Sequence, residues 1–339
     1  YALSIVFWSL AAMGHAAARS AFGFGVARFA LGLGEAGNFP AAVKVVAEWF
    51  PKRERALATG LFNAGSNVGA IVAPLAVPWI TIHYGWRWAF LITGAVGFFW
   101  VIFWWLGYRV PQEHPRVGQA ELAHILSDPP EPSTRIPWVR LLAHKETLGL
   151  VAARFITDPV WWFYLYWVPK FLNSQHGITL DKIGLPLVVI YLTADFGAVF
   201  GGWLSGYFLR RGWTVNAARK TAIFTCILMI APIVVTSRVT SLWTAVLLLG
   251  LATAGHQGWA SNIFTIVSDM YPRRAVSSMV GICGFGGSIG GMLVASATGL
   301  ILERTGSYLP VFLLAGTSYF AALGIIHLTS PKLAPVDVD

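Results

Sequence analysis

The sequence has little charge: Asp, Glu, Lys and Arg make up only 12% of its 339 residues, against about a quarter in soluble domains. A soluble chain of this length needs more charge to cover its surface, so the composition excludes that class. Hydrophobic residues account for 56% of the chain, and the mean hydropathy is +0.64. The 16 Trp and 22 Phe residues suit a membrane boundary. The sequence therefore predicts an integral membrane protein.

Cysteine is also scarce. Cys226 and Cys283 are the only two and both lie in apolar runs, which gives no support to a disulfide framework or a metal site. The net charge of +9 comes from basic residues scattered over short loops, which argues against nucleic acid as a partner. The glycines of GSNVG and GFGGSIGG follow no predicted strand, so they indicate close helix packing rather than a nucleotide loop. We expect no cofactor, no metal and no enzymatic activity.

Long apolar runs are what the chain does contain. Windows of about 20 residues, enough to cross the hydrocarbon of a bilayer, predict ten membrane spans. They cover residues 1–18, 22–49, 56–81, 87–108, 147–172, 184–209, 220–237, 241–270, 276–302 and 308–329. The expected domains are an incomplete N-terminal bundle of four helices at 1–108, a cytoplasmic linker at 109–146 with a short amphipathic piece GQAELAHILSD, a six-helix bundle at 147–330 and a cytoplasmic tail at 331–339.

The positions of the basic residues orient the predicted spans. Of the 24 Lys and Arg residues, 15 lie in loops on the side of Tyr1 and six lie in loops on the opposite side. Basic loops stay on the cytoplasmic side of a membrane. We therefore expect both termini in the cytoplasm.

The two halves of the chain repeat each other at a constant offset of 221 residues. Identical residues at this offset are Pro51 and Pro272, Arg53 and Arg274, Gly34 and Gly255, Gly60 and Gly281, Gly65 and Gly286, Gly69 and Gly290, and Gly85 and Gly306. Internal repeats of this kind are typical of transporters. The second half has six predicted spans and the first has four, so we expect the parent protein to carry two further helices before Tyr1.

Four stretches resemble the anion:cation symporter branch of the major facilitator superfamily, and most of all its bacterial hexuronate transporters. They are ARFALGLGEAGNFPAAVKVVAEWFPKRERALATGLFNAGSNVGAIVAPL, RFITDPVWWFYLYWVPKFL, YLTADFGAVFGGWLSGYFLRRG and GHQGWASNIFTIVSDMYP. The resemblance implies an all-α major facilitator fold, with ten of its twelve transmembrane helices here, in the bacterial cytoplasmic membrane. It also implies import of a sugar acid by proton symport with alternating access.

The expected partners are a small organic anion, protons and the lipid bilayer, and we expect a monomer. Two alternatives stay open. One is a carrier of another anion, such as an aldonate, an aldarate or an organic phosphate. The other is a transporter-like membrane sensor that binds its ligand without moving it.

Arg28 and Glu35 are the main candidates for the site. They lie seven residues apart in an apolar run, close to two helical turns, so both project from one helix face. Ionised groups at this depth are costly. The alternative for Arg28 is a structural role, with its side chain extended to the membrane interface. The resemblance implies that Arg28 binds the substrate carboxylate and takes part in coupling, and that Glu35 carries the proton.

Further candidates lie on other predicted helices. His256 occupies the repeat position of Glu35, and with Trp259 and Asn262 it offers hydrogen-bonding groups to the hydroxyls of a sugar acid. Structural hydrogen bonding is the alternative for these residues, and contacts between helices or with the interface are the alternative for the remaining ones. The other candidates for substrate contact are Asn63, Ser66, Asn67, Trp162 and Tyr166, those for gating or structural roles are Asp195, Arg55, Arg210 and Arg211, and Asp158, followed by Pro159, is expected to cap its helix.

Overall fold

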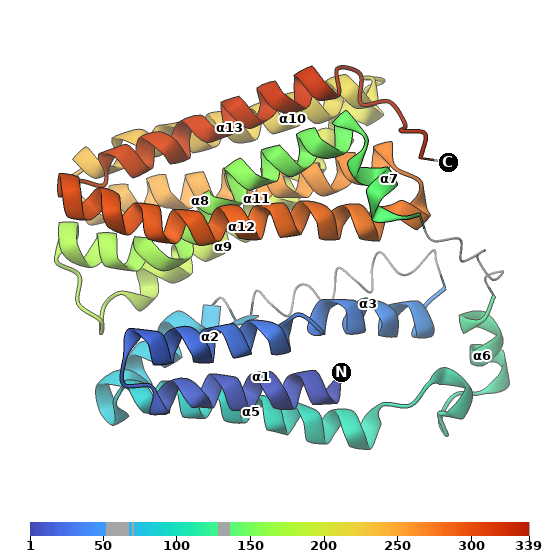
Figure 1. Cartoon of the computed structure of the whole chain (residues 1–339), viewed down its shortest axis with the longest axis horizontal. Helices are drawn as coiled ribbons and strands as arrows, with labels where there is room; N and C mark the ends of the chain where they lie inside the picture. The colour runs from blue at the N-terminus through green and yellow to red at the C-terminus, as the bar shows by residue number, and fades with distance from the viewer. Residues whose placement is uncertain (52–67, 70, 128–135, 339) are drawn as a thin grey trace. The chain divides into compact units, whose positions relative to one another are not determined.

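The computed structural model is helical throughout the part of the chain that it describes, residues 1–51, 68–69, 71–127 and 136–338, and these residues contain no strand (Figure 1). The chain divides into two compact units, Tyr1–Glu131 and Pro132–Asp339. The division falls inside the segment that the sequence predicts as a linker. The all-α fold class is therefore confirmed.

In the first unit α1 and α5 pack on each other, and α2 packs against α1. Its elements are α1 (Ala2–Gly14), the 3-10 helix η1 (His15–Ala17), α2 (Ala21–Glu35), α3 (Asn38–Trp49), a helix at Ile71–Tyr84, α5 (Trp86–Gly107), η2 (Pro111–Glu113) and α6 (Gln119–Ile125). The amphipathic piece of the predicted linker forms α6.

The second unit is a bundle in which α11 packs mainly on α9 and α12 mainly on α8, while α13 lies along α8 (Figure 1). Its elements are α7 (Trp138–Leu142), α8 (Lys145–His176), α9 (Gly184–Arg210), α10 (Val215–Ile230), η3 (Ala231–Arg238), α11 (Leu242–Met270), α12 (Arg273–Thr305) and α13 (Leu309–Thr329). The sequence did not predict α7, a single short turn in the linker.

Helices occupy the predicted apolar windows, with one difference within the described residues. The window 22–49 forms two helices, because α2 ends at Glu35 and α3 begins at Asn38. Pro40 lacks an amide hydrogen, so the carbonyl of Ala36 cannot receive its ordinary helix hydrogen bond from that position. The helix ladder is interrupted there, directly after Glu35.

Five of the described helices are long and apolar enough to cross a membrane. They are Trp86–Gly107, Gly184–Arg210, Val215–Arg238, Arg274–Thr305 and Leu309–Thr329. Helices α8 and α11 are also long, with 32 and 29 residues. Both carry polar side chains within their length, among them Arg154, Asp158 and His256. Polar groups at such positions are functional candidates by default.

The internal repeat is visible in how the helices cross. A Cβ atom added to Gly34 of α2 would lie 2.7 Å from the backbone nitrogen of Trp8 in α1. A Cβ atom added to Gly255 of α11 would lie 3.1 Å from the Cβ of Met229 in α10. Trp8 and Met229 are themselves 221 residues apart. The same close approach of backbones, which only glycine allows, therefore occurs in both units.

The turns repeat as well. Gly85, between the helix Ile71–Tyr84 and α5, has a φ of +90°, and Gly306, between α12 and α13, has a φ of +64°. Backbones with positive φ favour glycine, because a side chain would be strained there. Each unit therefore has a glycine at the equivalent turn, where one helix ends and the next begins.

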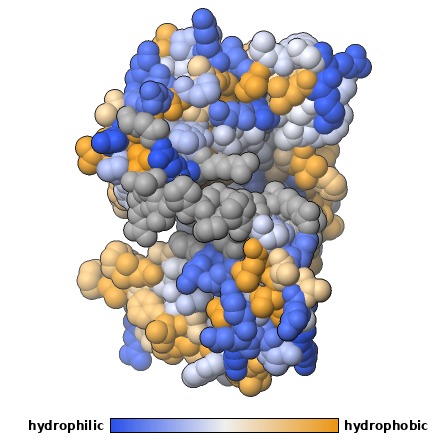
Figure 2. Space-filling view, turned by 90° about the vertical axis from the view of Figure 1, so that its right-hand side faces the viewer, coloured by the Kyte–Doolittle hydropathy of each residue, from blue (hydrophilic) through white to orange (hydrophobic). Residues whose placement is uncertain are grey.

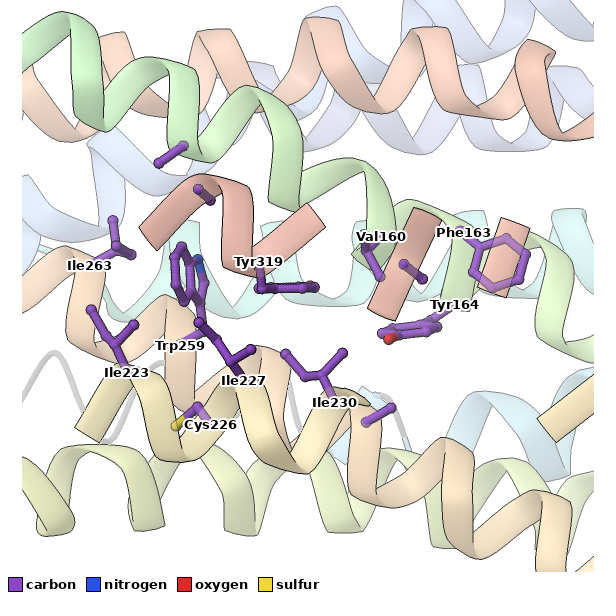
Figure 3. Packing of buried hydrophobic residues seen from close by; sticks show 14 of the residues in the cluster. Val160, Phe163, Tyr164, Ile223, Cys226, Ile227, Ile230, Trp259, Ile263 and Tyr319 are labelled. Atoms are coloured by element: carbon purple, nitrogen blue, oxygen red, sulfur yellow. The ribbon is translucent and has the colours of Figure 1, made fainter. Parts of the chain in front are cut away.

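The core of the second unit draws buried residues from α8, α9, α10, α11, α12 and α13. Figure 3 shows Trp259 of α11 beside Tyr319 of α13, with the aliphatic face of α10 next to Trp259. That face consists of Ile223, Cys226, Ile227 and Ile230, all fully or almost fully buried.

Large apolar side chains also cover the outside of the helices. Phe29 is 71% exposed, Phe196 73% and Phe285 72%, as expected of helices that present their outer faces to lipid. Over the helix ends of the second unit, where α7 and the C terminus lie, the surface instead carries many hydrophilic residues (Figure 2). Such a division between apolar sides and polar ends is typical of a membrane bundle.

Candidate functional site

Arg28 and Glu35 are exposed residues of α2, the helix that packs against α1. Helix α2 begins with Ser20 as its cap, which accepts a hydrogen bond from the Gly23 amide at 3.1 Å. Within α2 only Gly34 is buried, at the crossing with α1, and the side chains of Arg28 and Glu35 are both exposed. The structure thus presents both charged groups on one helix, with Glu35 as its last residue. Their roles in binding and coupling stay a prediction.

His256 lies in the interior of the second unit and is only 4% exposed. Its Nδ1 is 2.5 Å from the hydroxyl oxygen of Tyr319 on α13. Its ring stacks on Trp161 of α8, with centroids 5.2 Å apart and planes 9° from parallel, and Tyr164 meets it edge-on at 6.4 Å. Residues of α8 and α13 therefore hold the imidazole in one orientation.

Trp259 and Asn262 belong to helix contacts in this conformation. Trp259 is buried with its ring 5.4 Å from that of Tyr319, nearly perpendicular to it (Figure 3). The amide nitrogen of Asn262 donates to the carbonyl oxygens of Gly201 in α9 and Gly258 in α11, each at 2.9 Å. The bond to Gly201 joins α9 to α11. Substrate contact by either residue stays a prediction.

Arg154 and Asp158 of α8 form an ion pair that the sequence analysis did not identify. Nε and Nη2 of Arg154 donate to the same oxygen, Oδ2 of Asp158, at 2.9 and 2.6 Å. The guanidinium lies 4.7 Å from the ring centre of Phe264 on α11. The two side chains are only 13% and 15% exposed.

The prediction that Asp158 caps a helix is wrong. Helix α8 runs without interruption from Lys145 to His176, with Pro159 inside it. Helix α8 therefore carries a charged pair along its length instead of a terminus at Asp158. The i, i+4 spacing of an arginine and an aspartate was the signal in the sequence that could have revealed the pair.

Three other candidates lie on α8 and α9. The rings of Trp162 and Tyr166 stack with centroids 5.7 Å apart, and Trp162 also contacts Gly291 of α12. Asp195 is half-buried in α9. Among the described residues, none is within hydrogen-bonding or ion-pairing distance of its carboxylate. The expectation of a partner or a gating role for Asp195 stays a prediction.

Two of the three predicted gating arginines lie at the surface. Arg210 and Arg211 at the end of α9 are exposed, and the guanidinium of Arg211 lies 5.1 Å from the ring centre of Tyr207. Arg55, Asn63, Ser66 and Asn67 fall outside the described residues.

A buried charged contact near the ends of the helices involves Arg219 of α10. Its Nε donates to Oδ2 of Asp269 in α11 at 2.9 Å, and its Nη1 donates to the hydroxyl of Ser205 in α9 at 2.6 Å. Asp269 is 221 residues after Glu48, which accepts a hydrogen bond from the hydroxyl of Tyr108 at 2.5 Å. An acidic residue at this repeat position therefore joins helices in both units.

Comparison with known proteins identifies the family. The family model of the Major Facilitator Superfamily matches residues 1–260. The hexuronate transporter of Escherichia coli (strain K12) is 30% identical over 333 residues, which are 96% of this chain and 76% of the relative. The D-galactonate transporter of Escherichia coli O6:H1 is 30% identical over 97% of this chain and 79% of its own. The galacturonate transporter of Dickeya chrysanthemi is 33% identical over 68% of this chain and 69% of its own.

A solved structure agrees in fold. The crystal structure of a bacterial homolog to the human lysosomal transporter Spinster, in an inward-facing and occupied conformation, matches with a TM-score of 0.69. The sequences are 20% identical, and the match covers 98% of this chain and 80% of the other. At this identity the likeness shows the shared fold alone.

Proposed function

The chain belongs to the Major Facilitator Superfamily of membrane transporters, and we propose that it imports a sugar acid of the hexuronate type together with protons. Relatives named as transporters of hexuronate, galactonate and galacturonate support the substrate class. The observation that carries the proposal in the structure is Arg28 and Glu35 on one exposed side of α2. An arginine suits a carboxylate, because its planar guanidinium binds both oxygens at once.

The distance between the two groups explains how a proton and an anion can favour each other. Seven residues of helix are about 10 Å, too far for a direct ion pair but close enough for electrostatic interaction. Two unit charges at that distance interact by about 1.7 kcal/mol at an effective dielectric constant of 20, and by only about 0.4 kcal/mol in water. Ionised Glu35 therefore competes with the substrate carboxylate for Arg28 only when water is excluded.

Protonation of Glu35 removes this competition. The substrate then binds Arg28 more tightly, and by linkage the bound substrate favours the protonated glutamate. Symport results if both are released together on the other side of the membrane. We propose that transport follows an alternating-access cycle. The protein would lie in the bacterial cytoplasmic membrane with both termini in the cytoplasm.

Proteoliposomes that contain the full-length protein test the proposal. A proton gradient should drive accumulation of labelled glucuronate or galacturonate, with galactonate, galactarate and an organic phosphate as competitors. Glu35→Gln mimics the protonated state, so we expect substrate exchange to persist while proton-driven accumulation is lost. Arg28→Ala should abolish binding, and Arg28→Lys should restore it poorly because two-pronged contact is lost.

Two outcomes would count against the proposal. Full concentrative uptake by Glu35→Gln would remove Glu35 from the coupling mechanism. Tight binding of a sugar acid by the wild-type protein, without accumulation in sealed vesicles, would instead favour a sensor.

A further inference from the structure

We infer that Arg154 and Asp158 form an anion site of the second unit, in which the substrate carboxylate replaces Asp158 on Arg154 when Asp158 takes up a proton. The inference rests on the proposed function, because the ligand is the carboxylate of the transported sugar acid. A hexuronate has a single carboxylate, so Arg154 binds it at a different step of the transport cycle from Arg28. Arg154 is thus a specificity-determining arginine on α8 in addition to the candidates on α2.

The ion pair does not use all the hydrogen-bonding capacity of Arg154. Both donors that Arg154 uses, Nε and Nη2, converge on one oxygen of Asp158. Its buried Nη1 has no partner within the described part of the chain. Since a guanidinium has five N–H donors and unmade hydrogen bonds in an interior are costly, Arg154 has unused capacity for a second oxygen ligand.

The depth of the pair makes the exchange of partners depend on protonation. The side chains are 13% and 15% exposed, so both are accessible yet largely dehydrated. A buried arginine that loses its counter-charge is strongly destabilised. Neutralising Asp158 with a proton therefore raises the affinity of Arg154 for another carboxylate, and a bound carboxylate stabilises the protonated aspartic acid.

The surroundings of the pair suit a sugar acid. His256 lies within electrostatic range of Arg154 and Tyr319 within range of Asp158. Trp161 stacks on His256, so polar and aromatic side chains surround the pair. The titratable groups that face the pair from the neighbouring helices are His256 on α11, Cys283 on α12 and Tyr319 on α13.

The contact with α12 fixes the position of Asp158. A Cβ atom at Gly287 would overlap Oδ2 of Asp158, so glycine is what allows the carboxylate to lie against the α12 backbone. The ligand carboxylate that replaces Asp158 on Arg154 therefore binds at α8, next to the contact between α8 and α12.

Three variants of the full-length protein separate this site from a merely structural ion pair. They are Asp158→Asn, Arg154→Gln and the double variant, with glucuronate binding measured by calorimetry at about pH 6 and about pH 8, around neutrality. We expect Asp158→Asn to bind more tightly than wild type at the higher pH. We expect Arg154→Gln to bind at least about tenfold more weakly, the loss typical of a hydrogen bond to a charged group, and the double variant to bind no better than Arg154→Gln.

A structural pair predicts the opposite pattern, because either single variant would be harmed and the double variant would recover. Recovery of wild-type affinity by the double variant, or no gain in Asp158→Asn at the higher pH, would therefore overturn the inference. Lys170→Gln, which removes an exposed cation from the same helix, serves as the control and should bind like wild type. Arg154→Lys, which keeps the charge, should bind with intermediate affinity and guards against misfolding of the glutamine variant.

The wild-type measurement distinguishes failure of the proposed function from failure of this site. If the wild-type protein binds none of the sugar acids, the proposed function fails. If it binds glucuronate and Arg154→Gln binds it equally well, only the assignment of this site fails.

Discussion

Tyr319→Phe tests how firmly the second unit holds His256. The change deletes one hydroxyl and leaves the ring, so the contacts of that ring with Trp259 at 5.4 Å and with His256 at 6.0 Å persist. What disappears is the 2.5 Å hydrogen bond to Nδ1 of an imidazole that is only 4% exposed. A buried polar group without its partner costs about 1–3 kcal/mol. We expect the variant to be destabilised by that amount.

Thermal unfolding of the purified full-length protein measures the effect. For a unit of this size, 1 kcal/mol corresponds to roughly 2–4 °C, so Tyr319→Phe should lower Tm by several degrees. Tyr84→Phe, at a tyrosine that is 59% exposed, is the control and should have the same Tm as the wild type. A double-mutant cycle with His256→Gln should give a coupling free energy of about 1 kcal/mol or more. Equal Tm values for both tyrosine variants and no coupling would refute the reasoning.

Two further predictions concern helix packing and the tail. Gly255→Ala should destabilise the protein by about 1–3 kcal/mol through overpacking, because the added Cβ would lie 2.6 Å from the Cys226 carbonyl oxygen. The control is Gly281→Ala, whose Cβ would meet no atom within 4 Å and which should not lower Tm. Lys220→Met should expose the C-terminal tail to protease, because Nζ of Lys220 donates to the Ser330 carbonyl oxygen at 2.9 Å, and an unchanged cleavage rate would contradict a fastening role.

The positions of the helices could be predicted from the sequence because an apolar run of bilayer length has few alternatives to a membrane helix. The interruption after Glu35 was missed for the same reason: the window 22–49 is apolar throughout, and the effect of Pro40 on the backbone is local. Hydropathy reports which segments enter a membrane. It does not report where a helix inside that segment is broken.

The site was only partly predictable, because burial and pairing depend on contacts between distant segments. The repeat singled out His256, but its partner Tyr319 lies 63 residues further along the chain. Arg154 and Asp158 are neighbours on one helix, and they were still overlooked because Pro159 suggested a helix start. A local pattern had two interpretations there, and only the continuous α8 decides between them.

The repeat shows how one packing arrangement can carry two chemistries. Gly34 and Gly255 mark the same helix crossing, and the next residue along the chain is Glu35 in one unit and His256 in the other. Five residues beyond Glu35 stands Pro40, while the equivalent position, residue 261, is a serine that can donate its backbone hydrogen bond. Helix α2 therefore ends at an exposed glutamate, whereas α11 continues past a histidine held among aromatic rings. A single proline therefore accounts for the different positions of these two repeat-related residues: Glu35 stands at a helix end, whereas His256 lies inside a continuous helix.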